Sequence, residues 1–319
     1  MNDGLMIAGC LTGAVGLAGV AAAGLALSRR NGSYLAAGHA LARRGDVDPL
    51  PAVLRRGLGG LTVPVTPGPR GELFLGPGAP QPGRTLRRLV LTPLLARVRG
   101  NGGRLSRDQQ TPFGLVVEFT GEVRDAETLL RAYRMLDQQL RDHAPLLSRC
   151  TGDDFTPGAV IVSVTGIVDV RELLATQDER YLFAEGSFDD VGSAAAPAGL
   201  VPVISEPWGR RFGWDGLEPI PAEERHLLHA MVRSAHDDGR TVRISALPEG
   251  PRRARAALWT ELAAAGVDAI AGHDQRGLAR HLRRHLVSRR TAPTLPARPG
   301  RRPSPRPTGP RPDRRREPV

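Results

Sequence analysis

Two pairs of histidines stand at spacings that could hold a metal ion on one face of a helix. His226 and His229 are three residues apart, and His281 and His285 are four apart. Imidazoles on adjacent helical turns can ligate a divalent cation, although most such sites add further ligands. Neither pair has a nearby carboxylate set that would complete the coordination. We therefore interpret both pairs as cationic residues of outer helices.

The short motifs that mark common chemistries are absent. No G-x-G-x-x-G turn follows the first strand-like run, and the chain has no Walker motif, no G-x-S-x-G elbow and no HExxH sequence. The two cysteines, Cys10 and Cys150, lie in an apolar segment and in the middle of the chain. They build neither a disulfide framework nor a cysteine-based zinc site.

The positive charge is concentrated at one end of the chain. The net charge is +11, but residues 289–319 contain ten arginines against Asp313 and Glu317, which gives this segment +8. The remaining +3 is spread over 288 residues, so the sequence predicts no nucleic-acid-binding domain. With nine prolines, the same segment cannot bury apolar surface, and we expect a disordered tail. The tail either attracts anionic lipid or another polyanion, or is a solvated extension.

The amino-terminal region, residues 1–30, is predicted to be a membrane anchor or a signal segment. Residues 4–27 carry no charge, and as a helix these 24 residues exceed the roughly 30 Å hydrocarbon core of a bilayer. Asp3 precedes the segment and Arg29-Arg30 follow it, which favours a single-pass anchor with the body on the cytoplasmic side. The alternative is secretion after cleavage near Ala21-Ala22-Ala23.

Between these ends, apolar or β-branched runs repeatedly precede amphipathic stretches, a pattern typical of a parallel sheet with crossover helices. Eight strands are predicted, at residues 34–38, 58–65, 114–119, 159–164, 180–183, 200–204, 241–246 and 267–271. Seven helices are predicted, at residues 49–56, 84–99, 126–143, 168–176, 221–238, 251–265 and 276–286. Eight such units in residues 31–288 match a (β/α)8 TIM barrel of the α/β class.

Several stretches resemble the phospholipase-C-like phosphodiesterases, specifically bacterial relatives of the altered-inheritance-of-mitochondria group, which are allied to the glycerophosphodiester and phosphatidylinositol-specific enzymes. The resemblance covers nearly the whole body. It is carried by Gly71-Glu72-Leu73, by GRTLRRLVLTPLLARVRGNGGRL from Gly83, by LVPVISEPW from Leu200, by FGWDG from Phe212 and by GVDAIAGHDQRGLARHL from Gly266.

Members of this family use a His-x-His-Asn-Asp motif after the first strand, a Glu-x-Asp pair on the second, and a His-Asp pair after a Gly-Glu-Leu turn. One histidine acts as base and another as acid, while carboxylates hold Mg²⁺ or Ca²⁺. By this resemblance His39 takes the place of the first histidine. The remaining positions are substituted by Leu41, Ala42, Arg43, Thr62, Pro64, Pro77 and Gly78.

The resemblance leaves four candidate site residues. His39 is either a catalytic remnant or a neutral histidine at a strand end, and Glu118 is either a remnant metal ligand or a carboxylate bonded to a neighbouring strand. Arg43 is a candidate to bind phosphate without cleaving it. Trp208 either contacts substrate at the pocket mouth or caps the barrel together with Phe212 and Trp214.

The resemblance implies a phosphoric diester hydrolase of lipid metabolism, acting on lipid-type or glycerophosphodiester substrates. The substituted positions predict weak or lost catalysis, and therefore a pseudoenzyme. No cofactor is expected, because the ligands for Mg²⁺ or Ca²⁺ are largely lost. The alternative is a non-catalytic barrel that binds a phosphorylated headgroup or a protein partner at the membrane.

Overall fold

Eight parallel strands form a closed ring in the computed structural model, which describes residues 33–43, 45–76, 80–120, 126–152, 154–166 and 170–289. Each strand pairs with the next, and β1 pairs with both β2 and β12, so the sheet closes. The strands are β1 (Leu35–Leu41), β2 (Leu58–Pro67), β4 (Phe113–Phe119), β7 (Val160–Thr165), β9 (Leu182–Gly186), β10 (Val203–Pro207), β11 (Thr241–Ser245) and β12 (Ala269–Gly272). The predicted (β/α)8 barrel is confirmed.

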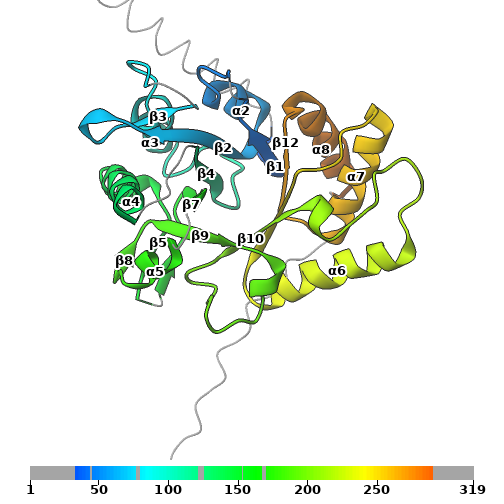
Figure 1. Cartoon of the computed structure of the whole chain (residues 1–319). Helices are drawn as coiled ribbons and strands as arrows, with labels where there is room; N and C mark the ends of the chain where they lie inside the picture. Colours follow the sequence, from blue (N-terminus) through cyan, green and yellow to red (C-terminus); the bar gives the residue numbers. More distant parts are fainter. Residues whose placement is uncertain are drawn as a thin grey trace, which may run out of the picture.

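In the part of the chain that the structure describes, seven α-helices accompany the strands. Figure 1 shows them outside the ring. They are α2 (Leu50–Arg56), α3 (Thr92–Gly100), α4 (Ala126–Arg141), α5 (Val170–Ala175), α6 (Ala222–Asp237), α7 (Arg252–Ala265) and α8 (Gln275–Arg289). Gly57 and Gly266 end α2 and α7 in the left-handed conformation, with φ of 71° and 86°, which a residue with a Cβ adopts only at a cost. The predicted helix over residues 84–99 is split into a π-helical turn (Arg87–Leu91) and α3 around Pro93, which has no N–H to donate.

Three strands begin two or three residues later than predicted, among them β12, which begins at Ala269 rather than Val267. β10 begins at Val203 rather than Leu200, because the N–H groups of Leu200 and Val201 both bond to the carbonyl of Pro197 and form a turn. β9 begins at Leu182 because Arg180 pairs instead with Cys150. That pairing belongs to a small sheet of β5 (Arg149–Thr151), β6 (Asp154–Thr156) and β8 (Glu179–Arg180), which the sequence did not predict.

The outward faces of the strands make the main core. Val63, Val117, Val162 and Ile244 alternate with interior residues along their strands and are fully buried. Each fully buried side chain of this size contributes on the order of 1.5–3 kcal/mol. Helices cover this outer layer, which leaves the inward faces of the strands and the two ends of the barrel to carry function.

Three features named in the sequence analysis lie outside the described residues. They are the predicted anchor or signal segment (residues 1–30), the tail from residue 290 onward, and the Pro77-Gly78 position of the resemblance. Within the part of the chain that the structure describes, no helix has the length and hydrophobicity needed to cross a bilayer. A further strand, β3 (Leu73–Leu75), pairs antiparallel with the last residues of β2 at the carboxyl-terminal end of the barrel.

Candidate functional site

The carboxyl-terminal end of the barrel is where the sequence predicted chemistry. Glu118 faces the interior near the end of β4, because it follows the interior-facing Gly114 and Val116 at the two-residue period of a strand. Its neighbours in register are Pro64 on β2 and Thr165 on β7. Its side chain is half-buried and makes no hydrogen bond or ion pair with the described residues.

His39 lies deeper in the barrel. Its side chain is 2% exposed, and its Nε2 lies 2.8 Å from Thr62 Oγ1. Burial lowers the pKa of His39 well below its ordinary value of 6.5, and the nearby positive charge of Arg243 lowers it further. The imidazole is therefore neutral at pH 7. In this form it carries a single N–H and is not the imidazolium acid that would protonate a leaving group.

The structure does not bring His39 and Glu118 together. His39 pairs in register with Gly60, and Gly60 pairs with Gly114, so these residues share one level of the barrel. Glu118 lies four residues beyond Gly114 on β4, which is about 13 Å of extended strand. Two residues can act as acid and base in one reaction only when both lie within hydrogen-bond reach of the reacting atoms of the substrate. The two predicted remnants therefore do not form one acid–base site in this arrangement.

The described residues at this end do not fit a hard divalent cation. Ca²⁺ takes roughly six to eight oxygen ligands and Mg²⁺ about six, and a protein holds Mg²⁺ through one or two carboxylates and Ca²⁺ through more. Glu118 supplies one carboxylate, and its neighbours Pro64 and Thr165 supply a single hydroxyl. Among the described residues, no three histidine, cysteine, aspartate or glutamate side chains come close enough to hold a metal.

Arg43 follows β1 at the same end of the barrel and is exposed. Its backbone N–H donates to Asp46 Oδ2 at 2.9 Å, and its carbonyl accepts from the Asp46 N–H at 3.0 Å. These contacts fix the backbone of the turn and leave the guanidinium at the surface. The role of Arg43 as a phosphate ligand stays a prediction.

Trp208 lies in a buried aromatic cluster after β10. It is 1% exposed, stacks on Phe212 at 4.3 Å between ring centroids, and donates its indole N–H to the carbonyl of Trp214 at 2.7 Å. Trp214 in turn donates its indole N–H to the carbonyl of Glu218 at 2.7 Å. A side chain so covered has almost no surface for a substrate, so this geometry favours the alternative in which Trp208 caps the barrel.

A buried ion pair inside the barrel was not predicted. Arg243 on β11 donates to Glu185 Oε2 on β9 at 2.5 Å and to Ser205 Oγ on β10 at 2.8 Å, and Ser163 on β7 donates to Glu185 Oε1 at 2.7 Å. Both charged side chains are 9% exposed. The sequence contains one indication of this pair. Arg243 and Glu185 are each a single charge in an otherwise apolar strand, at a position whose side chain points into the barrel.

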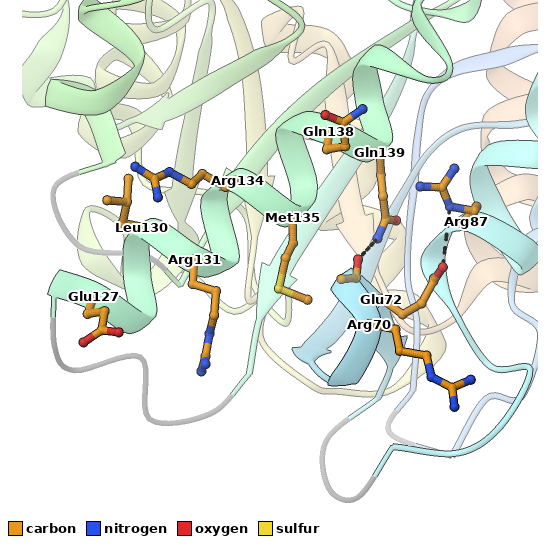
Figure 2. Close-up of a pocket in the computed structure, with 11 residues that line it drawn as sticks. Arg70, Glu72, Arg87, Glu127, Leu130, Arg131, Arg134, Met135, Gln138 and Gln139 are labelled. Atoms are coloured by element: carbon orange, nitrogen blue, oxygen red, sulfur yellow. Dashed lines mark hydrogen bonds and ion pairs between the residues drawn. The ribbon is translucent and has the colours of Figure 1, made fainter.

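A basic groove lies outside the barrel, beside the carboxyl-terminal end. It has a volume of about 510 Å³ and lies between the turn before β3 and helix α4. Arg87 is held by Glu72 at 3.7 Å and by Asp142 at 2.8 Å. Figure 2 shows further arginines on both walls, and these make no ion pair with the described carboxylates. They are Arg70, Arg131 and Arg134.

The two histidine pairs lie on outer helices, as expected. The rings of His281 and His285 on α8 are 4.3 Å apart, and His281 packs edge-on against Trp259 at 5.4 Å. Burial lowers the pKa of His281 to about 4, with smaller effects from His285 and Arg284. His281 is therefore neutral at pH 7, which corrects the prediction that it is cationic. It packs among aromatic rings and pairs with no carboxylate among the described residues.

The buried His39 predicts a pH dependence of stability. The unfolded chain binds a proton at His39 below about pH 6.5, whereas the folded chain keeps the ring neutral. The stability that depends on this neutral ring is fully present above pH 6.5 and is lost as pH falls below it, by up to about 1.4 kcal/mol per pH unit. Urea unfolding at pH 7.5, 6.5 and 5.5 should show a shallower decline for His39→Gln. The exposed His226→Gln should keep the wild-type decline; an equal decline in all three proteins would contradict a buried neutral ring.

Comparisons with known proteins support no assignment beyond the fold. No protein-family model matches the chain, and no curated protein matches it. Among solved structures, β-methylaspartase from Clostridium tetanomorphum is similar at 10% identity and a TM-score of 0.46, over 81% of this chain and 60% of its own length. A glycerophosphoryl diester phosphodiesterase from Parabacteroides distasonis is similar at 11% identity and a TM-score of 0.45, over 81% of this chain and 91% of its own.

Both scores are too low to carry an argument about function. What establishes the class is the closed ring of eight parallel strands with helices outside it. The chain is a (β/α)8 barrel.

Proposed function

We propose that this chain is a phospholipase-C-like phosphodiesterase barrel in which phosphodiester cleavage is weak or lost. The proposal starts from the ordered sequence segments that resemble the family, and the confirmed barrel is compatible with it. The observation that carries the loss of catalysis is the separation of His39 from Glu118, with no second carboxylate beside Glu118 among the described residues. A phosphodiester there meets neither a charge-neutralising cation nor a paired acid and base.

A second candidate function is binding of a phosphate ester without cleavage. It is favoured by the basic groove, in which Arg70, Arg131 and Arg134 have no described carboxylate partner. Guanidinium groups bind phosphate oxygens through paired N–H donors. On this proposal the ligand is a glycerophosphodiester or a phosphorylated headgroup, and the exposed Arg43 adds a further cation on the same side of the barrel.

The test measures turnover of bis-p-nitrophenyl phosphate and a glycerophosphodiester by the full-length chain with Mg²⁺ or Ca²⁺. We expect a rate within about tenfold of the uncatalysed reaction. The reason is that a site without a paired acid and base loses the roughly 10²–10⁴-fold that general acid–base catalysis contributes in an active enzyme. Metal-dependent turnover that His39→Ala or Glu118→Gln abolishes, and that the surface variant Glu218→Gln retains, would overturn the proposal.

A binding arm of the same experiment separates the second candidate. Glycerol 3-phosphate should bind the wild-type chain and lose affinity in the triple variant Arg70→Gln, Arg131→Gln, Arg134→Gln. The matched triple variant Arg99→Gln, Arg104→Gln, Arg107→Gln removes the same charge from exposed positions outside the groove. Equal loss in both triple variants would mean that net charge, and not the groove, attracts the ligand.

A further inference from the structure

A cavity opens at the amino-terminal end of the barrel, opposite the end at which barrel enzymes carry their active sites. Its volume is about 440 Å³, within the range of small-molecule pockets. It is lined by the first residues of several strands, including Ala36, Ile161, Val203 and Ala269. The cavity is therefore separate from the carboxyl-terminal mouth on which the proposed function rests.

The cavity exists because the sequence places small residues where a barrel interior is usually filled. Bulky branched side chains normally pack the interior in layers. Here the interior at the amino-terminal end of the barrel contains the small residues Ala36, Gly59, Gly114 and Ala269. A Cβ added at Gly114 would lie 3.8 Å from His39 Nδ1, which is ordinary contact, so a larger residue at this position is sterically possible. At Gly114 the open space therefore follows from the residue type, whereas at Gly59 the close backbone of Ala36 leaves no room for a side chain.

The walls are apolar and the floor is polar. Val116, Ile161 and Val203 face the space from the strands, and Phe155 covers one side, where its ring packs edge-on against Phe183 at 5.7 Å. Arg243, His39 and Ser163 line the space where it reaches the middle of the barrel.

Arg243 provides the donor at this floor. Its charge is compensated by Glu185, so the floor carries no net charge and does not favour an anion. Its Nη2 donates to Glu185 and Ser205, and its Nε is closed off from the cavity. Its Nη1 has no acceptor among the described residues and is not closed off, while the whole residue is 7% exposed. A ligand oxygen in the cavity would give Nη1 an acceptor.

The cavity is open to solvent at the rim. Ala36, Thr111 and Thr241 line it and are exposed, and Ala198 lines it and is half-buried. A molecule can enter between them without unfolding the strands. The cavity thus has an open rim, apolar walls, and a floor that carries no net charge but offers a hydrogen-bond donor. Together these features indicate the class of ligand that fits it.

We propose that this cavity binds a neutral, mostly apolar small molecule whose carbonyl or hydroxyl oxygen accepts a hydrogen bond from Arg243. The chemistry selects against anions, because Glu185 already holds the guanidinium, and against purely hydrocarbon ligands, because they leave the Nη1 donor of Arg243 without an acceptor.

The test uses Nile red, a neutral dye with one carbonyl, titrated into the full-length chain and followed by its fluorescence. We expect one dye per chain. Gly114→Leu should fill the space and weaken binding at least about tenfold, since each buried methylene contributes about 0.8 kcal/mol to apolar binding. Ala36→Phe should do the same from the exposed rim, where it requires no repacking of the core, so the test survives a folding defect in the first variant.

Gly272→Leu is the matched control, because Gly272 ends β12 at the opposite end of the barrel with no atom within 4 Å of an added Cβ. It should bind the dye within about twofold of the wild type. Cyclododecanone should displace the dye at least about tenfold better than cyclododecane, which has no acceptor. Dye binding that is unchanged in both Gly114→Leu and Ala36→Phe would overturn the site, and equal competition by the two compounds would overturn the role of Arg243. Neither outcome depends on the turnover or phosphate-binding results.

Discussion

Replacing Glu185 with alanine should lower the free energy of unfolding by about 3–5 kcal/mol. The substitution leaves the Arg243 guanidinium charged in the barrel interior, where Ser205 Oγ at 2.8 Å is its remaining partner among the described residues. A buried charge without its counter-ion costs far more than the pair itself contributes. Urea unfolding of the full-length chain, with the midpoint and slope fitted together, measures the loss.

Two further variants make the result specific to the buried pair. The double variant Glu185→Leu, Arg243→Met should recover at least half of the loss, because it removes both charges and keeps similar volume. Asp142→Ala breaks the ion pair with Arg87, in which both side chains are more than a third exposed, and should cost no more than about 1 kcal/mol. A double variant as unstable as Glu185→Ala alone would contradict the ion-pair explanation.

Gly60→Ala should destabilise the barrel by about 1–3 kcal/mol, whereas Gly114→Ala should stay within about 0.5 kcal/mol of the wild type. The two glycines are paired in register at the level of His39. An added Cβ at Gly60 would overlap His39 Nδ1 and would also lie 3.0 Å from the carbonyl oxygen of Gly114. His39 cannot move away easily, because it is buried and bonded to Thr62.

The comparison isolates the clash, since both substitutions reduce the freedom of the unfolded chain equally. Thermal and urea unfolding of the two variants provide the measurement. In a His39→Ala background, the additional cost of Gly60→Ala should shrink, because the overlapping ring is gone. A cost that persists unchanged in that background would place the conflict in the backbone and not in His39.

The fold was predictable because its signals are local. All eight strands follow from apolar runs between amphipathic stretches, and helix ends follow from residues such as Gly57 and Gly266. Errors arose where a tertiary contact decided between neighbouring residues. Leu200 is as apolar as Val203, but the turn at Pro197 takes its N–H out of the sheet. The small sheet that pairs Cys150 with Arg180 joins residues 30 apart, and nothing in either segment indicates the other.

The site was predictable only residue by residue. The position of Glu118 near the end of its strand followed from the sequence, whereas His39, predicted at the end of a strand over residues 34–38, lies inside β1. The levels of both residues depend on the register from β1 through β2 to β4, which is set by pairing between distant segments. The same reason hid the pair of Arg243 and Glu185, which are 58 residues apart. Trp208 carried an aromatic signal that fits both a pocket and a cap, and only its burial separates them.

The point at which the chain enters the barrel bears on how the protein would sit at a membrane. β1 starts at the amino-terminal rim, and residues 28–34 join it to the predicted anchor over at most about 25 Å. An anchored chain would therefore turn this rim, with its apolar cavity, toward the bilayer and the carboxyl-terminal mouth toward the aqueous phase. In that orientation the arginines near the mouth would meet water-soluble phosphate esters, while molecules leaving the bilayer would reach the opposite end first.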